Sequence, residues 1–191
     1  MHRTLLLLLL SPSLLIACSR APIKSEDLAQ KLENPLYARQ YYSEQMDYMV
    51  SLFIKNDPQT QSGASAQLID RLRTESLDKA RAASRLELEG PRGSFSGPLN
   101  EVRGDVVLLE HTLFVGPDFS TSPGADLRMM LTGGDPRSPG FPDETTVDLG
   151  PLKDAFGAHR YDVPPEATNL RTVVLWDAQL KRLFGVAQLA Q

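Results

Sequence analysis

The sequence has little of what most catalytic and metal sites are built from. It contains one cysteine, Cys18, and three histidines among 191 residues. A single cysteine allows neither an intrachain disulfide nor a Cys-x-x-Cys site, and no His-x-x-His or Glu-x-x-His spacing is present. The segment Gly93-Ser94-Phe95-Ser96-Gly97 has phenylalanine, not serine, at its centre, so it is not a nucleophile elbow. These absences predict a protein that is not an enzyme and that has no bound cofactor.

Clustered positive charge and long apolar runs are also scarce. The chain has 20 Lys and Arg against 24 Asp and Glu, a formal net charge of −4, and the two signs are mixed. Without a basic cluster interleaved with aromatic residues, nucleic-acid binding is not expected. Beyond residue 16 no stretch approaches the roughly 20 apolar residues that a transmembrane helix needs. Any membrane contact must therefore come from the N-terminus.

The N-terminal residues form a distinct pattern. Met1-His2-Arg3 gives a basic start, a largely apolar run extends to Ile16, and Leu15-Ile16-Ala17-Cys18 follows. This order is typical of a signal peptide. The last four residues resemble the lipobox of bacterial lipoproteins, in which the cysteine thiol is acylated and the bond before it is cut. We expect residues 1–17 to be a signal peptide, with Leu15, Ile16 and Ala17 recognised by the peptidase and Cys18 lipidated. The alternative is an ordinary secretory signal with an incidental cysteine.

The lipobox resemblance has consequences for localisation. Two or three acyl chains hold a protein on a membrane durably. It thus implies a protein anchored in the cell envelope through its N-terminal lipid. Ser19, not aspartate, follows the cysteine, which in enterobacterial lipoproteins implies transfer to the outer membrane. We therefore expect an outer-membrane protein that faces the periplasm.

Residues 18–25 are interpreted as the lipidated tether, and residues 26–85 as a helical segment. Asn34-Pro35 combines an N-cap residue with proline at the first helical position, and Asn56-Asp57-Pro58 ends the helix that follows. A second helix extends to about residue 84, which predicts an antiparallel hairpin. Apolar residues at helical spacing share one face of the first helix: Tyr42, Met46, Met49, Val50 and Phe53. We expect this face to pack on the second helix or on the domain that follows; the alternative is a groove for a partner.

The pattern changes to β structure after residue 86. Short apolar or alternating runs are separated by glycine and proline: 102–108, 112–115, 127–131, 145–149, 159–163, 172–176 and 183–187. Residues 132–144 are rich in Gly, Pro and Asp and predict a loop. The fold class is therefore α+β, a helical hairpin followed by an all-β sandwich or partly closed barrel.

Several motifs in the β half resemble one family. They are Gly104-Asp105-Val106-Val107-Leu108, Asp148-Leu149-Gly150-Pro151-Leu152-Lys153, Leu170-Arg171-Thr172-Val173-Val174-Leu175-Trp176 and Phe184-Gly185-Val186-Ala187-Gln188-Leu189. Together they resemble the DM13 domain, which we place at residues 88–191. The resemblance implies an electron-transfer role that depends mainly on a cysteine directly after the tryptophan. Asp177 stands at that position here, and an aspartate forms neither a thiolate nor a haem thioether.

Trp176 and Asp177 are accordingly the candidate ligand or family site. Neighbouring strand residues point to opposite faces, so if Trp176 packs inward, Asp177 faces outward or lies at a strand end. If Asp177 is buried, its expected partners are cations: Arg171, Lys181 or Arg182. His111 and His159 are the remaining candidates for a metal or haem, although no ligand spacing supports them.

The sequence thus favours a non-enzymatic binding module whose partner is an envelope protein or a small ligand. One alternative, taken from the family resemblance, is an electron-transfer or cofactor-carrying module. Another is a structural envelope component that self-associates through the Tyr/Met helix face.

Overall fold

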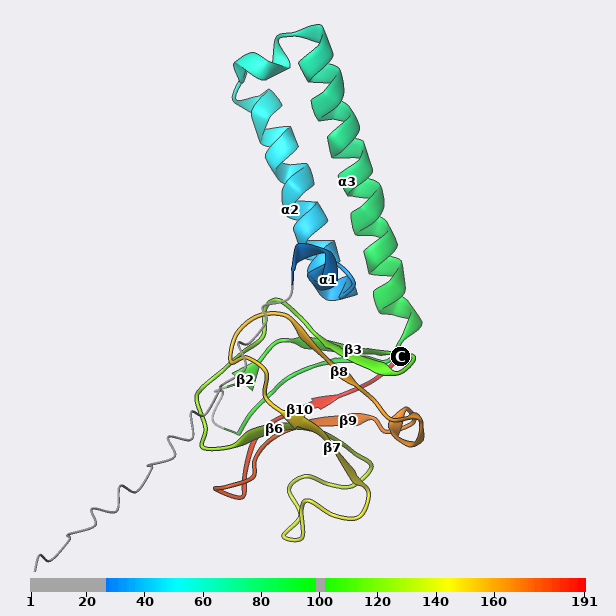
Figure 1. The fold of residues 1–191 in the computed structure, drawn as a ribbon, viewed down its shortest axis with the longest axis vertical. Helices are drawn as coiled ribbons and strands as arrows, with labels where there is room; N and C mark the ends of the chain where they lie inside the picture. Colours follow the sequence, from blue (N-terminus) through cyan, green and yellow to red (C-terminus); the bar gives the residue numbers. More distant parts are fainter. Residues whose placement is uncertain (1–26, 99–101) are drawn as a thin grey trace, which may run out of the picture.

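The computed structural model describes residues 27–98 and 102–191. The predicted signal peptide, Cys18 and the tether lie outside these residues. The described chain has an α+β fold, with helices first and antiparallel sheets after them (Figure 1). The helical elements are α1 (Leu28–Lys31), α2 (Pro35–Ile54), η1 (Pro58–Thr60) and α3 (Gly63–Glu89). Within the described residues, no helix has the length and apolar character needed to cross a membrane.

Helices α2 and α3 form the predicted hairpin, which projects from the β domain (Figure 1). The Asn34 side chain caps α2 by accepting the N–H of Leu36 at 3.1 Å, and Pro35 occupies the first turn. The buried positions of α3 are spaced for one helical face and are mostly small: Ile69, Ser76, Ala80 and Ala83. Small side chains allow the two helices to approach closely, and the Ser76 hydroxyl donates to Gln45 of α2 at 2.9 Å.

The base of the hairpin packs on the β domain. Asn34 Nδ2 donates to the carbonyl of Val115 at 2.8 Å. Leu36 is buried in one cluster with Val107 and Phe114, whose side chains lie on the outer face of the first sheet. These contacts fix the hairpin to the sheet through its first turn.

The β domain consists of two four-stranded sheets and a short ribbon, all antiparallel. The first sheet has the order β1 (Arg92–Ser94), β3 (Asp105–Leu109), β4 (Thr112–Val115), β8 (His159–Asp162). The second has the order β10 (Arg182–Gln188), β9 (Thr172–Asp177), β6 (Leu127–Thr132), β7 (Thr146–Pro151). The ribbon pairs β2 (Val102–Arg103) with β5 (Ser120–Thr121), and a 3-10 turn, η2 (Pro165–Ala167), precedes β9.

The two sheets face each other across one apolar core. Val106 and Leu113 from the first sheet and Met129, Val173 and Leu175 from the second belong to the same buried cluster. Bridges between Arg92 and Ala190 and between Ser96 and Val186 join the sheets along one edge. The architecture is therefore a sandwich closed along one side.

One predicted strand was wrong. Residues 102–108 were expected to form a single strand, but Gly104 has φ +125°, and the chain divides there between β2 and β3. A Cβ at Gly104 would lie 2.5 Å from Cα of Phe119, so only glycine fits this turn.

A second, smaller apolar cluster lies outside the sandwich. The predicted loop at residues 132–144 folds over the outer face of the second sheet and places Phe141 against Trp176, with ring centroids 5.0 Å apart. Met130 and Val174 complete the cluster. This loop makes one end of the molecule, opposite the hairpin (Figure 1).

Candidate functional site at the end of strand β9

Trp176 lies on the outer face of the second sheet. Val173 and Leu175 point into the sandwich core, whereas Val174 and Trp176 belong to the outer cluster. The premise that Trp176 packs into the sandwich therefore does not hold. The loop that carries Phe141 covers the indole and leaves it 7% exposed.

Asp177 is the last residue of β9, and its side chain is completely buried. One carboxylate oxygen, Oδ2, accepts the N–H of Ala125 at 2.7 Å. The other, Oδ1, accepts the N–H groups of Gln179 at 3.1 Å and Leu180 at 2.9 Å. The buried carboxylate is thus satisfied by backbone donors from two loops.

The expected cation partners of Asp177 were wrong. The Arg171 guanidinium donates to the carbonyls of Thr168 and Leu170, both at 2.9 Å. Among the described residues, neither Lys181 nor Arg182 pairs with Asp177. Backbone N–H groups replace them because a tight turn brings several donors to one acceptor without burying a second charge.

Two opposing effects set the pKa of Asp177. Burial raises the pKa, but the backbone N–H groups of Leu180, Ala125, Asp126 and Gln179 together lower it below its ordinary value of 3.8. The carboxylate is consequently ionised at neutral pH and serves only as an acceptor. At Gly124 in the facing loop, a Cβ would lie 2.7 Å from Asp177 Oδ2, which shows how closely that loop approaches.

This geometry does not fit a thiol-dependent redox group. Both oxygens of Asp177 are engaged by the protein's own backbone. An aspartate at this position supplies neither a thiolate nor a thioether. Within the part of the chain that the structure describes, no group of three or more His, Cys, Asp or Glu residues is arranged to hold a metal ion.

The two candidate histidines do not meet. His159 in β8 is opposite Val115, whereas His111 is exposed in the turn between β3 and β4, at the other end of the β4–β8 pair. Along a strand this separation is roughly 13 Å. The His159 ring lies between Phe119 and Tyr161, with centroid distances of 5.1 and 5.6 Å. The structure therefore gives no shared ligand set.

His159 is a buried neutral residue. Its Nδ1 lies 3.0 Å from the carbonyl oxygen of Gly157, and its Nε2 has no hydrogen-bond partner among the described residues. Burial lowers the pKa of His159 to about 4, although the Gly157 carbonyl acts in the opposite direction. The ring thus behaves as part of the core.

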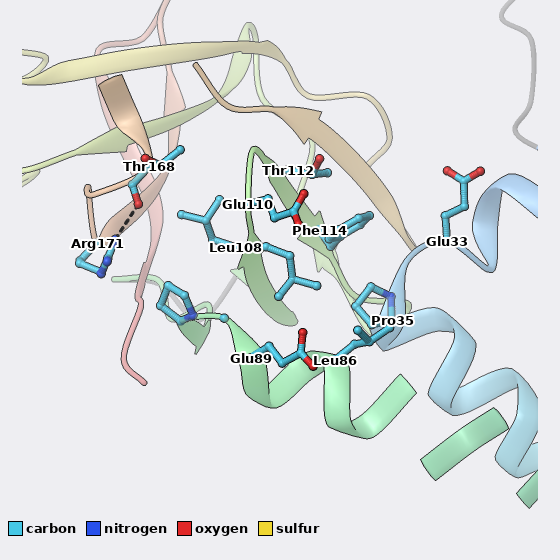
Figure 2. Close-up of a pocket in the computed structure, with 13 residues that line it drawn as sticks. Glu33, Pro35, Leu86, Glu89, Leu108, Glu110, Thr112, Phe114, Thr168 and Arg171 are labelled. Carbon is cyan, nitrogen blue, oxygen red and sulfur yellow. Dashed lines mark hydrogen bonds between the residues drawn. The ribbon is translucent and has the colours of Figure 1, made fainter. Parts of the chain in front are cut away.

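The concave surfaces of the molecule include two candidate binding sites. The first is a cleft of about 470 Å³ between the hairpin base and the first sheet (Figure 2). Figure 2 shows Leu86 and Glu89 of α3 on one side, with Leu108 and Glu110 across from them. Arg171 is at its far edge, where it donates to Thr168.

The second concave surface is a groove over Trp176, formed by two adjoining hollows of about 570 and 620 Å³. Phe141 and Trp176 border both hollows, and Arg137, Lys181 and Arg182 line the larger one. Local sequence patterns did not predict that these aromatic and basic residues come together. The only available signal was the aromatic residue within the Pro-rich loop, and nothing local indicated which sheet face the loop covers.

The fold and the site define an antiparallel β-sandwich with a Trp-Asp pair at the end of a central strand, preceded by a helical hairpin. The family model described as electron transfer DM13 matches residues 94–189, half of the chain. The chain therefore belongs to the DM13 family, and the hairpin lies outside the matched residues. No curated protein matches it. No solved structure matches it either.

Proposed function

We propose that this chain is a lipid-anchored cell-envelope protein whose DM13 domain acts as a non-enzymatic binding module. The observation that carries the proposal concerns Asp177, which occupies the position where the family resemblance implies a cysteine. Both of its carboxylate oxygens accept hydrogen bonds from backbone N–H groups. A carboxylate does not cycle between redox states, and this one accepts three backbone hydrogen bonds that tie two loops together. The domain then retains its fold and a concave surface beside Trp176, but not the residue on which the family's redox role depends.

Attachment to the membrane is the second part of the proposal. It is supported by the lipobox-like Leu15-Ile16-Ala17-Cys18 and by the single cysteine of the chain. Acylated Cys18 would leave no thiol elsewhere, and Ser19 supports an outer-membrane, periplasm-facing location. The partner would be another envelope protein or a small ligand.

Two other functions have specific support. The description of the family model supports an electron-transfer module, which here would have to hold its group without cysteine. A self-associating envelope component is supported by apolar side chains on the distal part of the hairpin, since Tyr48 is 60% and Ile54 75% exposed.

Measurements on a single preparation of the purified protein distinguish these three functions. The full-length gene is expressed in a bacterial host, and the protein is purified from the membrane in detergent for intact mass and a visible spectrum. We expect a chain that begins at Cys18 and carries acyl groups, with no visible absorption band. The Cys18→Ser variant should lack the acyl mass and should not sediment with membranes.

Each other result contradicts a definite part of the proposal. A chromophore or added non-lipid mass that survives purification would replace the binding role with the electron-transfer role. Membrane attachment of the Cys18→Ser variant would overturn the lipid anchor. A native mass that rises with protein concentration would favour self-association instead.

A further inference from the structure

We propose that the groove over Trp176 binds a small organic anion that carries a flat apolar group. This inference rests on the proposed binding role and gives that role a site and a ligand class. The groove is defined by Pro139, Phe141, Trp176 and Lys181, which border both of its hollows, together with Arg137 and Arg182 in the larger hollow.

The floor of the groove is aromatic and held in place. Trp176 and Phe141 are 7% and 8% exposed and meet edge to face at an interplanar angle of 72°. Prolines line the walls at Pro136 and Pro139, where their fixed φ limits the motion of the loop. Each hollow, at about 570 and 620 Å³, has the size of a small-molecule site. The surface is thus suited to a compact ligand with a ring.

The described residues that line the larger hollow carry an excess of positive charge. They include Arg137, Lys181 and Arg182, and no acidic residue is among them. Within the described residues, none of these three cations forms an ion pair. The protein as a whole has a net charge of −4, so this local excess is opposite in sign to the chain.

The smaller hollow contains an arginine that, unlike the cations of the larger hollow, is paired with acidic residues. Arg128 also borders the groove, but it is neutralised by Asp148 at 2.6 Å and by Asp126 at 3.8 Å. Arg137 and Arg182 therefore lie only on the side of the larger hollow, and Lys181 borders both hollows. An anionic group is attracted to that side, and the aromatic floor can hold an apolar ring beside it.

The turn that presents Lys181 is fixed. Lys181 has φ +51°, a left-handed conformation that needs support in a residue other than glycine. The preceding residues Gln179 and Leu180 donate their N–H groups to Asp177, and Arg182 lies 5.8 Å from the ring centroid of Phe184. Two of the cations are consequently held near the groove before any ligand arrives.

Trp176 provides the readout, because it is the only tryptophan of the chain. The full-length protein in detergent is titrated with phenyl phosphate and with phenylacetate while tryptophan fluorescence is recorded. Benzyl alcohol serves as the neutral probe of similar size, and inorganic phosphate as the anion without a ring. We expect a saturable fluorescence change with both aromatic anions, and none with the other two probes at the same concentrations.

Variants identify the groups responsible. The double variant Lys181→Gln with Arg182→Gln should bind the aromatic anions about tenfold more weakly, the effect of losing one charge-assisted hydrogen bond. Arg71→Gln, which removes an exposed cation of α3 far from the groove, should bind as the unmodified protein does. Circular dichroism confirms that each variant is folded.

Three results would overturn the groove assignment: no saturable response to either aromatic anion, an equal response to benzyl alcohol or inorganic phosphate, or unchanged affinity in the double variant. Failure here is distinguishable from failure of the proposed function. If the protein is lipidated and colourless but gives no titration response, only the assignment of this groove is rejected. If the protein carries a bound chromophore, the proposed binding role itself is rejected.

Discussion

The carboxylate of Asp177 joins two loops that are distant in the sequence. It accepts N–H groups from Ala125 on one side and from Gln179 and Leu180 on the other. A cysteine at this position would have one weak acceptor in place of two ionised oxygens. Asp177 is therefore a structural connection within the β domain.

Asp177→Asn should lower Tm by several degrees. The amide retains one acceptor oxygen but directs an NH₂ group at backbone donors, which leaves buried N–H groups unsatisfied. Asp162→Asn, at an exposed aspartate of β8, is the matched control. Thermal unfolding followed by circular dichroism measures both, and equal Tm values would contradict the role assigned to Asp177.

His159 should make stability depend on pH. Its ordinary pKa of 6.5 applies in the unfolded chain, whereas burial lowers the pKa to about 4 in the folded protein. Between these values the unfolded state binds a proton that the folded state does not, so stability is full above about pH 6.5 and falls as the pH decreases toward 4. The expected loss across this window is about 3 kcal/mol.

Urea unfolding at about pH 7 and pH 4.5 tests this prediction for His159. His159→Gln should show a smaller loss between the two pH values, whatever its absolute stability, because the titrating ring is gone. His111→Gln removes the exposed histidine and should retain the full loss. If the His159 variant retained the same pH dependence, the burial argument would be wrong.

At the scale of elements, the first turn of α2 both starts a helix and attaches the hairpin. Asn34 caps the helix through its side-chain oxygen and donates through Nδ2 to Val115 of β4. Ser62 caps α3 at the distal end of the hairpin, where it only accepts the N–H of Ser65 at 3.2 Å. Comparing variants of the two residues therefore distinguishes the effect of losing a helix cap from the effect of losing the contact between the hairpin and the sheet.

Asn34→Ala should lower the free energy of unfolding by about 2 kcal/mol, because it removes a helix cap together with the buried hydrogen bond that Asn34 donates to the Val115 carbonyl. Ser62→Ala should cost about 1 kcal/mol, the effect of a cap alone. Chemical denaturation monitored by circular dichroism gives both values. A similar cost for both variants would show that the Asn34–Val115 hydrogen bond contributes little to docking.

At the scale of the whole molecule, the hairpin and the groove lie at opposite ends. The described chain begins at the hairpin base beside the first sheet, and the loop over Trp176 closes the far side of the second sheet (Figure 1). The proposed ligand surface therefore lies at the end of the molecule away from residue 27, where the described chain begins.

Local patterns in the sequence were sufficient for much of this architecture. Asn34-Pro35 and Asp57-Pro58 mark the limits of α2, because capping and proline geometry act within a few residues. Short apolar or alternating runs bounded by glycine and proline predicted the strands of the second sheet. The motifs of the β half also predicted the family to which the chain belongs.

Tertiary structure alone decided what covers each face and which distant groups meet. Periodicity shows that Trp176 and Asp177 point in opposite directions, but the loop that carries Phe141 determines that the indole lies outside the sandwich. The donors to Asp177 come from backbone, which has no signature in the sequence. Arg137 joins Lys181 beside the groove only because the loop folds across the sheet. Short-range preferences thus set the elements, whereas the site depends on packing between segments that are far apart along the chain.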